Sequence, residues 1–145
     1  MDLQTLLDER DIVRALSRFA RILDNKEWNC LTEVFSNTIS FDYGTGEEQV
    51  GISALRSNMT RYLDCCGNTQ HLIGSIVVDV QGDEAISRAY VQARHQGKNE
   101  STGTVYDTNG EYVDQWERQK DGWKIIRRDA IWSMFAGNPA VIGRV

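Results

Sequence analysis

The sequence lacks any long apolar run. No stretch approaches the roughly 18 to 20 consecutive apolar residues that span a membrane. The N-terminus, MDLQTLLDERD, has no basic segment followed by an apolar one, which is the pattern of a secretion signal. We therefore expect neither a membrane segment nor export, and we expect the protein in the cytoplasm.

An excess of positive charge is also missing. The chain has 16 basic and 21 acidic residues, which gives a net charge of -5. Lys124, Arg127 and Arg128 form the only local basic run, and it is too short to follow a nucleic-acid backbone. Nucleic acid is therefore not an expected partner.

Cysteine, histidine and proline are scarce. The three cysteines are an odd count without a C-x-x-C pair, which favours reduced thiols over a disulfide framework. The two histidines have no metal-ligand spacing, and the chain contains no Gly-rich phosphate loop and no G-x-S-x-G turn. We expect no metal and no cofactor. The single proline, Pro139, leaves the central elements uninterrupted.

Helical spacing dominates the first half of the chain. Apolar residues recur at intervals of three and four and predict a helix over 3–24; they are Ile12, Val13, Leu16, Phe19, Ala20 and Leu23. Further helical stretches are expected over 26–36 and 52–66, with a strand over 38–44 between them.

After residue 68 the apolar period changes to two, which is typical of strands. We expect strands over 69–80, 85–96, 111–119 and 123–135, with turns at 81–84 and 120–122 and an irregular segment over 97–110. Helices followed by antiparallel strands predict an α+β fold in one domain over 1–145. The N-terminal helices would close a curved, cone-shaped antiparallel or mixed sheet around a pocket for a hydrophobic small molecule.

The alternation assigns side chains to the two faces of this sheet. Small residues and His95 share the pocket face of the strand over 85–96. Tyr112, Asp114 and Trp116 share one face of the strand over 111–119. The open face is expected to carry Ile86, Tyr90 and Trp132, and an aromatic, partly apolar face of this kind predicts a homodimer or a homotrimer.

Asp24 is the residue that fits a buried helix least well. It lies at the C-terminal end of the first helix, where the macrodipole disfavours a carboxylate, and helical geometry places it at the rim of the apolar face. His71 and His95 lie on strands that face the same pocket. A carboxylate beside a neutral imidazole makes a general base, so these residues favour proton transfer without a cofactor.

The chain resembles the SnoaL-like branch of the nuclear transport factor 2-like superfamily. The resemblance runs nearly end to end, through RDIVRALSRFARILDNKEWNCLTEVFS, TQHLIGSIVVDVQGDEAISRAYV and GEYVDQWERQKDGWKIIRR. Enzymes of that branch, such as scytalone dehydratase, hexachlorocyclohexane dehydrochlorinase and bile-acid 7-alpha dehydratase, have an Asp at the end of the first helix and a His at the start of a later strand. These positions match Asp24 and His71, while His95 and Tyr43 resemble a further histidine and a tyrosine of scytalone dehydratase.

The resemblance implies a cofactor-independent lyase, with dehydration of a hydrophobic cyclic molecule as the first expectation. The second expectation is isomerisation or cyclisation of a polyketide, steroid or terpenoid by the same pair of residues, Asp24 and His71, which we call the dyad. An epoxide hydrolase built from Asp114, Asp129 and an arginine at 94 or 127, and a non-catalytic ligand-binding or structural subunit, are further alternatives. Asp24, His71 and His95 are the expected catalytic residues, and the expected substrate contacts are Tyr43, Tyr112, Asp114, Trp116 and Arg128.

Overall fold

The computed structural model describes residues 1–144 and begins with a long helix, α1 (Leu3–Asn25), as the apolar spacing predicts. The Asp2 side chain caps its N-terminus by accepting a hydrogen bond from the Thr5 backbone N–H at 2.8 Å. Lys26 ends it in a left-handed conformation, with φ of 54°. Of the six apolar residues that predicted the helix, all except Val13 are buried.

The remaining elements follow in the order that the sequence predicts, with helical segments before the long strands. They are η1 (Trp28–Glu33), β1 (Phe35–Asp42), β2 (Gln49–Val50), α2 (Ile52–Leu63), β3 (Thr69–Gln81), β4 (Glu84–Gln96), η2 (Asn99–Ser101), β5 (Val105–Gln119), β6 (Gly122–Gly137) and η3 (Pro139–Ile142).

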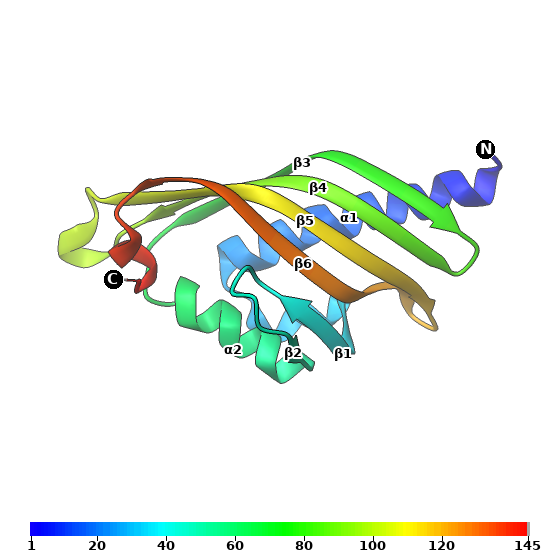
Figure 1. Ribbon diagram of the computed structural model, residues 1–145, viewed down its shortest axis with the longest axis horizontal. Coiled ribbons are helices and arrows are strands. Elements are labelled where there is room, and N and C mark those ends of the chain that lie inside the picture. Colours follow the sequence, from blue (N-terminus) through cyan, green and yellow to red (C-terminus); the bar gives the residue numbers. More distant parts are fainter. Residues whose placement is uncertain (145) are drawn as a thin grey trace.

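The strands form one curved sheet in the order β2-β1-β6-β5-β4-β3. β1 pairs with β6 in parallel, and the other neighbours are antiparallel. In Figure 1 the long helix α1 crosses one face of the sheet, and α2 lies beside β1 and β2 at the same side. The α+β prediction, with N-terminal helices against a curved mixed sheet, is confirmed.

Two boundaries differ from the sequence prediction. The expected helix over 26–36 is a short 3-10 segment, and Phe35 already belongs to β1. The irregular segment expected over 97–110 ends before Val105, because residues 105–110 pair with β4 and residues 106–110 also pair with β6. Gly110 suits this position since an added Cβ would lie 2.1 Å from the Ile131 carbonyl oxygen, a contact that only glycine avoids.

The two faces of the sheet carry different side chains. Inward-facing residues of β4 are buried as expected, from Ala85 to His95. The expectation for Trp132 was wrong: an irregularity between Asn109 and Gly110 shifts the register of β5 and β6, and the Trp132 ring packs inside against Tyr112.

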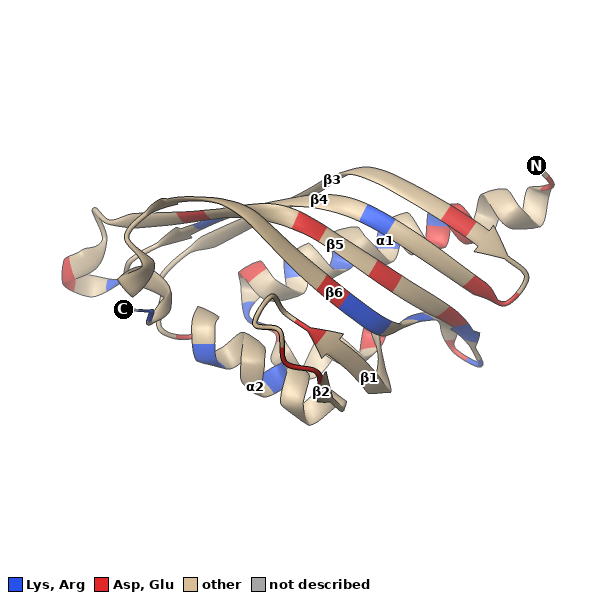
Figure 2. Cartoon of the chain, viewed as in Figure 1, with Lys and Arg blue, Asp and Glu red and all other residues tan. Residues whose placement is uncertain are grey.

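The outer face mixes exposed apolar residues with ion pairs between neighbouring strands. Arg88 of β4 pairs with Glu111 of β5 at 2.7 Å. Figure 2 shows both basic and acidic residues along β4, β5 and β6. Ile86 and Tyr90 are exposed on this face, at 51% and 61%. The homodimer or homotrimer that this face suggests stays a prediction.

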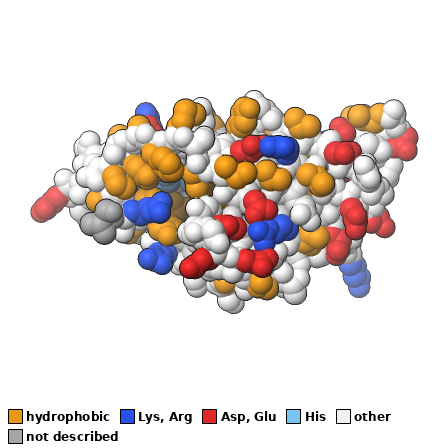
Figure 3. Space-filling model, viewed as in Figure 1, with side chains coloured by type: hydrophobic (Ala, Val, Ile, Leu, Met, Phe, Trp, Pro, Cys, Tyr) orange, Lys and Arg blue, Asp and Glu red, His pale blue; other side chains and the backbone are white. Residues whose placement is uncertain are grey.

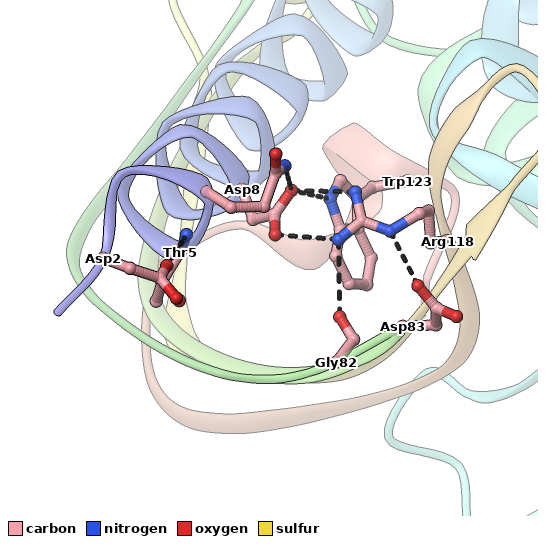
Figure 4. A network of polar contacts seen from close by, with 8 residues as sticks. Asp2, Thr5, Asp8, Gly82, Asp83, Arg118 and Trp123 are labelled. Carbon is pink, nitrogen blue, oxygen red and sulfur yellow. Dashed lines mark hydrogen bonds and ion pairs between the residues drawn. The ribbon is translucent and has the colours of Figure 1, made fainter.

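A buried carboxylate fastens the start of α1 to the sheet (Figure 4). The Asp8 side chain accepts two hydrogen bonds from the Arg118 guanidinium, each at 2.8 Å, and one from Trp123 Nε1 at 3.1 Å. The hydrogen bonds from Arg118 are the main reason that the pKa of Asp8 is lowered to about 2. Within residues 1–144 we find no helix with the length and apolar character needed to cross a membrane.

Candidate active site

A cavity of about 240 Å³ lies between the inner face of the sheet, the end of α1 and α2. Its walls are mainly aromatic and apolar, with Leu23 from α1, Tyr62 from α2 and Phe135 from β6. In Figure 3 this region is a hollow with a largely hydrophobic rim and a histidine visible inside. A cavity of this composition suits a small hydrophobic molecule, and it falls near the lower end of the usual size for ligand sites.

Asp24 contacts His71, and of the two only His71 belongs to the described lining of this cavity. The His71 Nδ1 lies 2.7 Å from Asp24 Oδ1, and the His71 backbone N–H donates to Asp24 Oδ2 at 3.1 Å. Thr69 adds a third hydrogen bond, from its hydroxyl to Asp24 Oδ1 at 2.9 Å. The last turn of α1 supplies the carboxylate and the start of β3 supplies its partners, so the packing of α1 on β3 assembles the pair.

The hydrogen bonds decide the ionisation of Asp24 and the tautomer of His71. Burial opposes the carboxylate charge, but the hydrogen bonds from His71 and Thr69 outweigh it and lower the pKa of Asp24. An ionised carboxylate only accepts, so His71 Nδ1 carries a proton, and in the neutral form of the ring Nε2 has a free lone pair. His71 lines the cavity, and no polar side-chain atom within residues 1–144 is sealed away without a partner. The Nε2 lone pair is therefore open to the cavity.

His95 lies beside His71 but has a different partner. The two rings are 5.8 Å apart between centroids and nearly perpendicular. His95 Nδ1 donates to the Tyr106 carbonyl oxygen at 2.8 Å, since a carbonyl only accepts. Burial lowers the pKa of His95, so this imidazole is neutral and also presents an unprotonated Nε2. It can accept a hydrogen bond from a ligand, and it is a poor proton donor.

Tyr43 and Tyr112 bring phenol groups to the cavity wall. The Tyr43 hydroxyl accepts a hydrogen bond from Arg128 Nη1 at 3.2 Å, and its backbone carbonyl accepts one from Trp132 Nε1 at 3.1 Å. The two phenol rings are 5.9 Å apart between centroids. Burial raises the pKa of both hydroxyls, so both are protonated at neutral pH and can donate hydrogen bonds.

Three residues that the sequence placed among the substrate contacts lie behind the cavity wall instead. Asp114 and Arg128 are fully buried and bound to each other, and Trp116 donates from Nε1 to the Ser87 hydroxyl at 2.8 Å inside the core. None of the three belongs to the described lining of the cavity. All three side chains face inward, as the alternation predicts. The inner face of the sheet also packs on α1, and the three residues lie in this packed region instead of at the cavity.

The alternative set for epoxide hydrolysis is dispersed in the structure. Asp114 is bound by Arg128 in the core. Arg127 pairs with Asp129 at 2.6 Å, Arg94 pairs with an aspartate of β5 on the outer face, and within residues 1–144 the cavity lining includes none of these side chains. No Asp–Arg–Asp arrangement around a cavity water is therefore formed by them.

Sequence reasoning missed several side chains of the site. Thr69 is two residues before His71 on the same strand face, so the period of two contained the signal that it would reach Asp24. Thr108 lines the cavity from the segment that was expected to be irregular. Asn58 and Tyr62 of α2 also line it, and without the helix orientation no sequence pattern distinguished them from exposed residues.

The sequence matches a known protein family over most of its length. The model of the SnoaL-like domain family matches residues 4–129. The chain belongs to the SnoaL-like family. None of the curated protein sequences matches this SnoaL-like chain.

Solved structures show the same fold over nearly the whole chain. The Kfla4162 protein from Kribbella flavida is 24% identical, covers 99% of this chain and 100% of its own, and has a TM-score of 0.87. A candidate scytalone dehydratase from Novosphingobium aromaticivorans is 25% identical, with 97% of both chains covered and a TM-score of 0.81. A type 2 hexachlorocyclohexane dehydrochlorinase is 14% identical, with 95% and 93% covered and a TM-score of 0.82. At 24% and 14% identity, the first and third likenesses show a shared fold.

Proposed function

We propose that this SnoaL-like protein is a cofactor-independent lyase that removes water from a hydrophobic, cyclic hydroxy-carbonyl compound. The observation that carries the proposal is the 2.7 Å contact between Asp24 and His71, because His71 also lines a largely aromatic and apolar cavity. The structural likeness to a candidate scytalone dehydratase supports the reaction class.

In this proposal His71 is the general base. Its Nε2 removes a proton from the carbon next to the substrate carbonyl, and Asp24 stabilises the imidazolium that forms. Asp24 is suited to that role because its hydrogen bonds lower its pKa and keep it charged. A positioned general base of this kind contributes roughly 10² to 10⁴ in rate.

The negative charge that develops on the substrate oxygen needs a hydrogen-bond donor. Tyr43 meets this need better than His95, because the phenol is protonated whereas His95 presents an unprotonated Nε2. In the elimination step the C–H bond breaks, the C=C bond forms and the C–O bond of the leaving hydroxyl breaks. The proton taken by His71 leaves with that hydroxyl as water.

Isomerisation shares the first proton transfer and differs only in where the proton returns. The same dyad therefore serves an isomerase, and the products distinguish the two reactions. In water enriched in oxygen-18, a hydrolase places the label in its product, whereas elimination and isomerisation by this route leave the carbonyl product unlabelled beyond background exchange.

The test is a panel of cyclic hydroxy-ketones, with loss of water followed by the ultraviolet absorbance of the conjugated product. For a turned-over compound, Asp24→Asn and His71→Ala should each lower kcat/KM by about 10² or more. Thr69→Val is the matched control, since it removes one hydrogen bond to Asp24 and leaves the contact with His71, and we expect a loss below about tenfold. Near wild-type turnover in His71→Ala would exclude the proposed base.

A further inference from the structure

A fully buried ion pair lies directly behind the cavity wall. Arg128 donates from Nε and Nη2 to the two carboxylate oxygens of Asp114, each at 2.8 Å, and both side chains are 0% exposed. Two parallel hydrogen bonds of this type fix the plane of the guanidinium. Since Asp114 occupies one edge of the guanidinium, only the Nη1 side remains for another partner.

A buried ion pair of this kind adds little to the net stability of a fold. The desolvation of two buried charges opposes their attraction, and well-packed apolar residues often serve at least as well. Burial disfavours the charge on Arg128, but Asp114 and the neighbouring phenols outweigh it and raise the pKa of Arg128 further. Burial raises the pKa of Asp114, and the bidentate contact with Arg128 opposes that rise and favours the ionised form.

The remaining guanidinium nitrogen of Arg128, Nη1, faces a residue of the cavity wall. Its guanidinium lies over the Tyr112 ring at 3.8 Å from the centroid and over the Phe19 ring at 4.4 Å. Nη1 donates to the Tyr43 hydroxyl oxygen at 3.2 Å. Because the phenol oxygen accepts from a cation, its own proton can be donated only to another group, which is the neighbouring Tyr112 hydroxyl oxygen or a ligand in the cavity.

The two ends of Tyr43 are held by different residues. Arg128 holds the hydroxyl, and Trp132 Nε1 holds the backbone carbonyl at 3.1 Å. A donor that is fixed before the substrate binds stabilises developing charge more effectively than a mobile one. A cation bound to the phenol oxygen also strengthens the O–H as a donor, since hydrogen bonds polarise one another in a low-dielectric site.

We propose that Arg128, held by Asp114, is a positioning residue that fixes the Tyr43 hydroxyl as a hydrogen-bond donor to an oxyanion in the cavity. Arg128 acts through Tyr43 and does not touch the ligand. The inference rests on the proposed function for its role in catalysis, but the oxyanion site itself is measurable without turnover. It assigns enolisable carbonyl compounds, which form planar oxyanions, as the ligand class of this wall.

The probe is 4-nitrophenol, whose ionised form has its own visible absorption. Titrating the free and the bound probe with pH gives the preference of the cavity for phenolate over phenol. The titratable or charged groups that line the cavity are His71, His95, Tyr43, Tyr62, Tyr112 and Arg144, and Arg128 and Asp114 lie behind the wall. We expect the wild type to prefer the phenolate by about tenfold, which is one pKa unit of the bound probe.

Two variants measure how much the Tyr43 phenol and the Arg128–Asp114 ion pair each contribute to the phenolate preference. Tyr43→Phe should abolish most of the preference. The paired replacement Arg128→Met with Asp114→Leu removes both charges without leaving one unpaired, and it should abolish the preference equally. Adding Tyr43→Phe to this pair should cause no further loss, because both changes act on one hydrogen bond. Arg127→Met is the matched control, because it removes the neighbouring arginine of β6, which pairs with Asp129 away from the cavity, and it should retain the preference.

Folding is checked by circular dichroism and thermal unfolding. If the paired replacement does not fold, Arg128→Lys gives the same comparison, because an ammonium cannot reproduce the planar fork that spans Asp114 and Tyr43. The inference is overturned if folded Tyr43→Phe or a folded Arg128 variant keeps the tenfold preference, if the losses add to that of Tyr43→Phe, or if the wild type has no preference. The preference is measured in binding alone, so this result is independent of whether the proposed lyase activity is correct.

Discussion

Removing the Asp8 side chain should destabilise the protein without changing its active site. Asp8 is 2% exposed and accepts hydrogen bonds from Gln4, Arg118 and Trp123. In Asp8→Ala the buried Trp123 N–H loses its partner, which costs about 1–3 kcal/mol. Arg118 is one-third exposed and keeps Asp83, so solvent limits its loss to about 1 kcal/mol.

The expected decrease in the free energy of unfolding is therefore about 2–4 kcal/mol. For a chain of this length, 3 kcal/mol corresponds to a decrease in Tm of about 6–12 °C. Urea unfolding and calorimetry measure the two quantities. Asp24 lies 16 residues further along α1, or about 24 Å, so binding of 4-nitrophenol should be unchanged in the folded variant.

Asp83→Ala is the matched control, because it removes the other carboxylate bound to the same guanidinium. The Asp83 side chain is 81% exposed, and an exposed ion pair contributes at most about 1 kcal/mol. The reasoning attributes the difference to burial. It is refuted if the two variants lose equal stability, or if Asp8→Ala unfolds at the wild-type urea midpoint.

Two further perturbations test the fold and its pH dependence. Gly110→Ala should lower the free energy of unfolding by about 3 kcal/mol or more, because the new Cβ would lie 2.1 Å from the Ile131 carbonyl oxygen; a wild-type urea midpoint would contradict this. Burial lowers the pKa of His95 in the folded protein, so the unfolded chain binds a proton at this residue more readily. The neutral His95 therefore contributes fully to the free energy of unfolding above its ordinary pKa of 6.5, and this contribution is lost as the pH falls through the lower pKa of the folded state. Between pH 8 and pH 5 the wild type should therefore lose more stability than His95→Gln, and equal losses would show that His95 does not contribute.

The helical half and the dyad were accessible from the sequence because each depends on local periodicity. Six apolar positions fixed α1 and its buried side, and Asp24 lay at the rim of that side. The period of two in β3 and β4 then placed His71 and His95 on one face. The same logic also applies to Asp8, which lies four residues before Ile12 on the buried arc. Its distant partners, Arg118 and Trp123, come from the end of β5 and the start of β6, and the periodicity of α1 does not specify them.

The sequence did not show which inward-facing side chains reach the cavity and which lie in the core behind it. Alternation shows that Tyr112, Asp114 and Trp116 face inward, but only the packing of α1 decides that Tyr112 reaches the cavity while the other two lie in the core. The side of Trp132 depends on the irregularity next to Gly110, which shifts the strand register. Irregularities of this kind depend on contacts between strands and leave no periodic signal in one strand.

The central claim is that His71, oriented by Asp24, removes a proton from carbon in this cavity. Nuclear magnetic resonance tests it directly by following the exchange of the α-protons of 2-tetralone, a cyclic ketone, in heavy water. The account predicts that the wild type accelerates this exchange, and that His71→Ala and Asp24→Asn each lose about 10² or more of the acceleration while Thr69→Val loses less than about tenfold. Wild-type exchange rates in folded His71→Ala would contradict it.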